Sequence, residues 1–363
     1  MSLPNTRSDR STALSDWARG AIAALGRIGL GRASPLVRIS AANPRFTILL
    51  KDESVQPTGS IKARLALRLI EDAIRDGRIE AATRLVDVSS GSTAIAEAAV
   101  AKRLGLSFTA IVPRGTTDRK IAEIEGYGGT VRLAENLEAA CDEAAHLGAR
   151  PGTCYLDQFG KAGAALDYQG PESLAGELFP QVRLAAGGRD PSAVFLSVGT
   201  GGSLAALAAA VRREALPTHI CLADPVGSDL HHIWCGSNPP PPEPIMVEGI
   251  GGRTRPGFRP ELVDSAVPVA DADSIAAAHM LSRLVGKPVG GSTGTAFWAL
   301  AENAASLGGS TPLILVSIIY DDGRRYADTI YSADWLSNKG LDIGPGCGFL
   351  AQFLGVQVPE CPA

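Results

Sequence analysis

Residues 194–211 read VFLSVGTGGSLAALAAAV and form part of the longest uncharged run in this chain of 363 residues. Apolar residues open the stretch, and alanines and leucines close it. Between them stands a polar, flexible turn made of Gly199, Thr200, Gly201, Gly202 and Ser203. A membrane-spanning helix would be apolar throughout its length. The interruption predicts instead a buried strand, a turn and a helix.

The same alternation extends outward from this stretch. Short β-branched runs such as TRLVDV (residues 83–88) and PLILVSIIY (residues 312–320) alternate with helical patterns such as residues 92–106 and 271–286. Strands alternating with helices of this length predict parallel sheets in an α/β fold. The proline-rich segment SNPPPPEP, residues 237–244, is predicted to be a loop.

The bulk composition excludes several classes of protein. Apolar residues make up 45% and charged residues 20% of the chain, which is typical of a globular protein. A net charge of −4 gives no broad basic face for nucleic acid. The six cysteines are scattered without a C-x-x-C pair, which favours reduced thiols and a cytoplasmic location. Residues 1–15 are polar, lack a secretory apolar core and are predicted to be a flexible tail.

One lysine lies in an unusual place. In VQPTGSIKARLALRLIED, residues 55–72, Ser60 can cap a helix whose first turn contains Lys62. The positive end of a helix dipole disfavours an ammonium group at that point. Lys62 is therefore either a solvated lysine at a helix start or an amine that must be neutral or condensed as an imine.

Two further loops gather hydroxyl groups before apolar helices. The first is SSGST, residues 89–93, and the second is GGSTGT, residues 290–295, whose first hydroxyl belongs to Ser292. Free N–H groups and hydroxyls at a helix N-terminus bind a carboxylate or a phosphate. Each loop could also be an ordinary helix cap.

The glycine turn at residues 199–203 also predicts an anion site, because glycines let backbone N–H groups face an anion. It lacks the lysine of a P-loop. It partly matches a dinucleotide-binding turn, with Asp224 ending the next strand, but Leu204 stands where a third glycine is expected. A nicotinamide-dependent (NAD) oxidoreductase is therefore an alternative.

An imine-forming lysine together with a phosphate site and a carboxylate site indicates pyridoxal 5'-phosphate acting on an amino acid. These stretches resemble the β-family of pyridoxal-phosphate enzymes, fold type II, which contains the cysteine synthases. KDESVQPTGSIKAR resembles the family's segment for the cofactor-binding lysine, and GTGGS resembles its phosphate loop. SSGST resembles the loop for the substrate carboxylate, and LDQF places Gln158 at a carboxylate ligand position. EGIG, which includes Gly249, resembles a loop on the substrate side.

The resemblance implies a role for each residue. Lys62 would be the catalytic base and would hold the cofactor. The cofactor would also be bound by Ser92, Gly199, Thr200, Gly201, Gly202, Ser203 and Ser292. The substrate would be bound by Ser89, Ser90, Gly91, Thr93, Gln158 and Gly249. At Ser292 a neutral hydroxyl at the pyridine nitrogen favours loss of a β-substituent over transamination.

The closest resemblance is to the cysteine desulfhydrase and S-sulfocysteine synthase branch. It implies elimination or replacement at Cβ of cysteine or of an O-activated serine through an aminoacrylate. Addition of sulfide or thiosulfate would make cysteine or S-sulfocysteine, whereas hydrolysis would release hydrogen sulfide, pyruvate and ammonia. The common synthases carry Asn where this chain has Ser92, which leaves the substrate pose open. YDDGRRY, residues 320–326, also departs from the family pattern.

The family's architecture implies two three-layer α/β domains with parallel sheets. Residues 1–47 and 159–363 would form a large cofactor-binding domain, and residues 48–158 a small mobile domain. A homodimer, a small amino-acid substrate and no nucleic-acid or membrane partner are expected. A non-catalytic relative that keeps the fold and ligand is a third alternative.

The HHIWC segment, residues 231–235, is predicted to be structural rather than a metal site. Two adjacent histidines were not expected to face one ion, and no second cluster of ligands lies near them in sequence.

Overall fold

The computed structural model describes residues 14–27, 29, 31, 33–166, 170–241, 243–252, 257–308 and 312–358. The chain divides into two compact units. The larger contains Leu30–Leu65 and Asp157–Ala363, and the smaller contains Met1–Gly29 and Ala66–Leu156. The predicted tail, up to residue 13, lies outside the described residues.

A six-stranded sheet forms the centre of the larger unit, in the order β1-β2-β10-β7-β8-β9. Its strands are β1 (Leu36–Ile39), β2 (Phe46–Asp52), β7 (Ala193–Ser197), β8 (His219–Pro225), β9 (Ser265–Val269) and β10 (Leu313–Ile319). All neighbouring pairs are parallel except β1 and β2. The antiparallel pair departs from the predicted all-parallel sheet, because the six residues between these strands are too few for a crossover helix.

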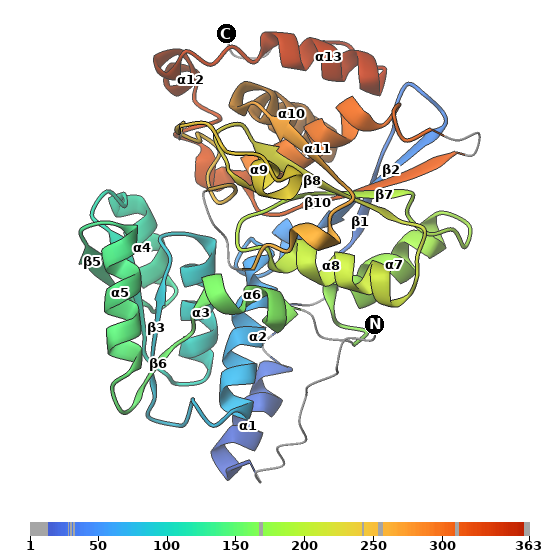
Figure 1. Ribbon diagram of the computed structural model, residues 1–363. Helices are drawn as coiled ribbons and strands as arrows, with labels where there is room; N and C mark the ends of the chain where they lie inside the picture. The colour runs from blue at the N-terminus through green and yellow to red at the C-terminus, as the bar shows by residue number, and fades with distance from the viewer. Residues whose placement is uncertain are drawn as a thin grey trace. The chain divides into compact units, whose positions relative to one another are not determined.

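Helices cover both faces of this sheet (Figure 1). On one face lie α10 (Asp271–Val285) and α11 (Gly291–Asn303), and on the other lie α7 (Leu174–Ala185) and α8 (Gly202–Arg213). The remaining helices of the unit are α6 (Gln158–Leu166), α9 (Leu230–Cys235), α12 (Ala333–Lys339) and α13 (Gly344–Leu354). Every residue of β7 and β10 is buried, as expected of parallel strands covered on both faces.

The smaller unit has a four-stranded parallel sheet in the order β5-β4-β3-β6. Its strands are β3 (Arg84–Val88), β4 (Phe108–Pro113), β5 (Thr130–Ala134) and β6 (Thr153–Tyr155). Its helices are α1 (Asp16–Leu25), α3 (Ser92–Arg103), α4 (Asp118–Gly126) and α5 (Leu137–Gly148), while α2 (Lys62–Arg75) runs across the division between the units. The predicted α/β fold with two parallel-sheet units is confirmed.

Several details differ from the sequence predictions. Residues 48–65 group with the larger unit, since β2 pairs with β10 of that unit. Residues 324–342 have helical spacing in the sequence, but this region forms only a short 3-10 turn, Gly323–Tyr326, and the seven residues of α12. Among the described residues, four cysteines are not disulfide-bonded: Cys141, Cys154, Cys221 and Cys235. Cys347 is disulfide-bonded, contrary to the expectation of reduced thiols.

The proline-rich loop was predicted correctly. Residues 237–241 and 243–244 form neither helix nor strand. Across the described part of the chain, no helix combines the length and the apolar character needed to cross a bilayer.

Candidate active site

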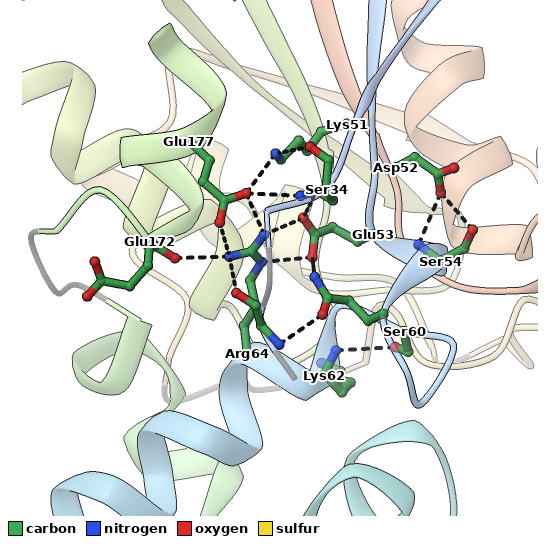
Figure 2. Close-up of polar contacts among 12 residues, drawn as sticks. Ser34, Lys51, Asp52, Glu53, Ser54, Ser60, Lys62, Arg64, Glu172 and Glu177 are labelled. Atoms are coloured by element: carbon green, nitrogen blue, oxygen red, sulfur yellow. Dashed lines mark hydrogen bonds and ion pairs between the residues drawn. The ribbon is translucent and has the colours of Figure 1, made fainter. Parts of the chain in front are cut away.

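The loop before Lys62 is held by the segment that follows β10. The Ile61 N–H donates to the Tyr320 carbonyl over 2.8 Å, and the Asp322 N–H donates to the Gly59 carbonyl over 2.9 Å. The hydroxyl of Ser60 accepts the backbone N–H of Lys62 at 3.3 Å, so the predicted cap is present (Figure 2). These contacts fix the residue that begins α2.

The amine of Lys62 lies at the glycine turn that joins β7 to α8. Its Nζ is 3.5 Å from the Thr200 hydroxyl. A Cβ added to Gly199 would stand 3.7 Å from this Nζ and 2.3 Å from the carbonyl oxygen of Gly249. The larger unit therefore brings together Lys62, the predicted phosphate loop and the predicted substrate-side loop.

The glycines of this turn leave room that no other residue would leave. Gly201 has a φ of +87°, and a Cβ there would lie 2.4 Å from the carbonyl oxygen of Gly257. A Cβ on Gly202 would lie 2.9 Å from the carbonyl oxygen of Ala162. The turn leads into the N-terminus of α8, with Ser203 in its first turn. Helix N-termini bind phosphate through N–H groups that lack partners within the helix.

Ser292 stands in the first turn of α11, beside the ends of two central strands. Its carbonyl oxygen accepts the Ser197 hydroxyl over 3.0 Å, which ties it to β7. The neighbouring Thr293 hydroxyl accepts the Tyr320 N–H over 3.0 Å, which ties it to the end of β10. These bonds fix the backbone that carries the Ser292 side chain.

Asp321 is a buried acid at this site that the sequence analysis did not select. Its Oδ2 accepts the Tyr326 hydroxyl over 2.6 Å. Its Oδ1 is buried and accepts no hydrogen bond from the described residues. A Cβ on Gly290 would stand 1.8 Å from this Oδ1, so the glycine makes space for the carboxyl group. Burial raises the pKa of Asp321 to about 6, although Tyr326, Arg325 and Lys62 act to lower it. The sequence signal that could have pointed to Asp321 is the YDDGRRY segment, residues 320–326, because it departs from the family pattern.

The predicted substrate-carboxylate loop belongs to the smaller unit. It follows β3, and its last residues begin α3. The Ser89 hydroxyl accepts the N–H groups of Gly91 and Ala94, each over 3.3 Å, so this side chain caps the helix start. Ser90, Ser92 and Thr93 complete the loop, and Thr93 is buried. The roles of residues 89–93 toward a substrate remain predictions.

Gln158 and Gly249 both lie in the larger unit. Gln158 is buried and begins α6. Gly249 has a φ of +84° and turns its carbonyl oxygen toward Gly199. Their contact with a substrate also remains a prediction.

A buried network of charges holds the start of α2, as Figure 2 shows. Arg64, two residues beyond Lys62, donates to both oxygens of Glu53 and both oxygens of Glu177, at 2.8–2.9 Å. Lys51 donates to Glu177 over 2.8 Å and to the Ser34 carbonyl over 2.7 Å. Two cations and two carboxylates thus neutralise one another in the interior.

The pKa shifts of Glu177 and Lys51 show that each charge in this network is stabilised by its oppositely charged partners. Burial alone would raise the pKa of Glu177, but Arg64 and then Lys51 lower it overall. Burial lowers the pKa of Lys51, and Glu177 only partly offsets the effect. The sequence analysis did not select this network, because Arg64 and Glu177 are 113 positions apart.

The fold and the site define a two-unit α/β enzyme with a lysine beside an anion-binding turn. The family model of pyridoxal-phosphate dependent enzymes matches residues 29–317, and the chain belongs to this family. It is a pyridoxal-phosphate enzyme, which confirms the cofactor indicated by the sequence and outweighs the NAD alternative.

Three relatives show the breadth of the similarity. The chain is 37% identical to L-cysteine desulfhydrase Cds1 of Mycobacterium tuberculosis, over 84% of each chain. It is 30% identical to a putative cysteine synthase of Sinorhizobium fredii, over 85% of this chain and 90% of that one. The crystal structure of O-acetylserine dependent cystathionine beta-synthase from Helicobacter pylori matches with 25% identity and a TM-score of 0.70, over 86% of this chain and 98% of that one.

The residues present fit the cofactor. The space that a Cβ at Gly199 would fill lies beside the Lys62 amine, and the α8 N-terminus follows it. An amine near such a turn can bind an aldehyde whose phosphate the turn accepts. When bound, the cofactor supplies an electron sink for a carbanion at Cα.

Proposed function

We propose that the protein catalyses elimination or replacement at Cβ of cysteine or of an O-activated serine, with sulfide or thiosulfate as acceptor in the replacement reaction. The observation that carries the proposal is the approach of Lys62 to Thr200 and Gly199 within one unit. The cysteine synthase and desulfhydrase relatives support the reaction class.

Each residue has a task in this proposal. Lys62 holds the cofactor and moves a proton at the substrate Cα. Residues 199–203 bind the phosphate, and Ser292 offers a neutral hydroxyl to the pyridine nitrogen. Ser92 donates a hydrogen bond to the cofactor ring.

The substrate-binding residues in this proposal are those predicted from the sequence. Residues 89–91, Thr93, Gln158 and Gly249 would hold the amino acid, with its carboxylate on the hydroxyl loop. We further propose that the small mobile domain, predicted as residues 48–158 and narrowed by the structure to Ala66–Leu156, closes over the substrate and excludes water. The protein would act as a cytoplasmic homodimer.

A second candidate function is L-cysteine desulfhydrase activity, which the 37% identity to the mycobacterial desulfhydrase favours. Both reactions share every step up to loss of the β-substituent. They differ in whether a sulfur nucleophile, sulfide or thiosulfate, or water completes the reaction.

Product analysis separates the two functions. The purified holoenzyme would be given cysteine alone, O-acetylserine with sulfide, and O-phosphoserine with thiosulfate. Faster formation of cysteine or S-sulfocysteine supports the replacement reaction. Faster release of hydrogen sulfide with equal pyruvate and ammonia from cysteine alone supports the desulfhydrase. No turnover of any β-substituted alanine by cofactor-loaded protein would contradict both and favour a non-catalytic relative.

A further inference from the structure

Three potential metal ligands meet on α9, which follows β8 in the larger unit. His231, His232 and Cys235 each offer one ligand atom, and these atoms all lie within 4.8 Å of one another. Successive residues of an α-helix are turned by about 100°, so Cys235 lies about 40° from His231 and about 60° from His232. All three side chains therefore lie on one side of the helix. The sequence prediction for residues 231–235 rested on the two adjacent histidines and did not include Cys235.

A fourth donor reaches the same point from the residue after the helix. The chain turns at Gly236, whose φ is +69°. The Ser237 hydroxyl then lies 2.8 Å from Nδ1 of His232 and 3.0 Å from Sγ of Cys235. One oxygen is thus held between a ring nitrogen and a thiol.

The chemistry of these donors selects the ion. Imidazole nitrogen with thiolate sulfur suits Zn²⁺, which binds four ligands tetrahedrally at about 2.0–2.3 Å. Such bond lengths place the ligand atoms roughly 3.3–3.7 Å apart. The ligand atoms lie within 4.8 Å of one another, so those farthest apart need to approach by about 1 Å, which rotation of half-exposed and exposed side chains allows.

The surroundings favour a cation. Cys235 carries a free, exposed thiol. Oδ2 of Asp224 accepts the backbone N–H of His231 over 2.8 Å, and the buried Oδ1 of Asp224 accepts no hydrogen bond from the described residues.

We propose that His231, His232 and Cys235 form a Zn²⁺ site, with the Ser237 hydroxyl or a water as fourth ligand. The site is separate from the residues around Lys62. The ion would fix the end of α9 to the beginning of the loop at residues 236–252. The other end of this loop is already held, because the Asp229 N–H donates to the Gly252 carbonyl over 3.0 Å. Zn²⁺ would therefore order the loop that carries Gly249.

Cobalt provides the test, because Co²⁺ replaces Zn²⁺ and reports its ligands by absorption. Chelator-treated holoenzyme would be titrated with Co²⁺ while its d–d bands, to the red of the cofactor's absorption, are followed, and Zn²⁺ would then be added. We expect one Co²⁺ per chain, a tetrahedral spectrum with thiolate charge transfer, and displacement by Zn²⁺. Cys235→Ser should lose the thiolate band, and His232→Ala should weaken binding about 10-fold or more.

Cys141→Ser is the matched control, since Cys141 is also a partly accessible cysteine outside a disulfide but lies in the smaller unit. It should retain the wild-type spectrum and stoichiometry. An unchanged spectrum in Cys235→Ser, or no saturable Co²⁺ binding by the wild-type protein, would overturn the proposal. Because the readout is metal binding, either result leaves the assignment of the reaction at Lys62 unaffected.

Discussion

The amine of Lys62 lies 3.5 Å from the hydroxyl of Thr200, although 138 positions separate the two residues. The contact joins the first turn of α2 to the turn that opens α8, and both belong to the larger unit. One unit thus holds the amine and the anion-binding turn in a fixed relation. The first two predictions follow from this contact.

Replacing Lys62 with alanine should abolish covalent attachment of the cofactor and lower kcat by roughly 10³-fold or more, since the base at Cα is removed. Borohydride reduction followed by peptide mass mapping should find the pyridoxyl group on the Lys62 peptide of the wild-type protein. Lys339→Ala, on an exposed lysine of α12, is the control and should keep both adduct and turnover. An adduct on a different lysine would contradict the assignment.

Replacing Gly199 with alanine should weaken cofactor binding by at least about 10-fold, because the new Cβ would stand 2.3 Å from the Gly249 carbonyl oxygen. Titration of the apoenzyme with pyridoxal phosphate measures this affinity. Gly348→Ala, within α13, meets nothing within 4 Å and should bind the cofactor as the wild type does. Equal affinity in the two variants would show that the turn does not enclose the phosphate.

Replacing Glu177 with glutamine should lower the free energy of unfolding by about 3–5 kcal/mol, because two buried cations would then share one carboxylate. Denaturant unfolding of the holoenzyme, followed by circular dichroism, measures the loss. Arg259→Gln removes an exposed ion pair with Glu261 in the same unit and should cost no more than about 1 kcal/mol. Similar losses in both variants would mean that the buried network does not stabilise the unit.

Stability should fall as the pH rises through the titration range of Asp321. The folded pKa is about 6, above the value of about 3.9 expected for an unfolded aspartate. Between about pH 3.9 and pH 6, Asp321 therefore keeps its proton in the folded state and loses it in the unfolded state. The stability that this proton contributes is lost as the pH rises to 6. The pKa shift corresponds to a loss on the order of 3 kcal/mol in the free energy of unfolding.

Asp321→Asn should remove this part of the pH dependence, whereas Asp334→Asn, at an exposed position of α12, should retain it. Urea unfolding of each protein from pH 4.5 to pH 7 supplies the comparison. If the wild type and Asp321→Asn changed in parallel over this range, Asp321 would not be the titrating group.

Sequence reasoning found the parts of the site that depend on local pattern. The Ser60 cap, the position of Lys62 in the first turn and the strand–turn–helix around Gly199 are all features of neighbouring residues, and the structure contains them. The features it missed depend on residues far apart. Nothing near Arg64 indicates Glu177, whose helix also contains Pro180 and gives a weak helical signal. Asp321 could not be recognised from its neighbours in sequence either, because its burial depends on Gly290 from another loop.

The place of β2 in the sheet has a consequence for synthesis of the chain. Its parallel neighbour β10 begins at Leu313, and the Tyr320 carbonyl that binds Ile61 follows that strand. During translation, β2 leaves the ribosome long before β10 exists, whereas Ala66–Leu156 form one continuous stretch of the smaller unit. At about 5–20 residues per second, the wait lasts on the order of 13–50 s. The edge of β2 that later pairs with β10 is unpaired during this interval and open to pairing with another chain.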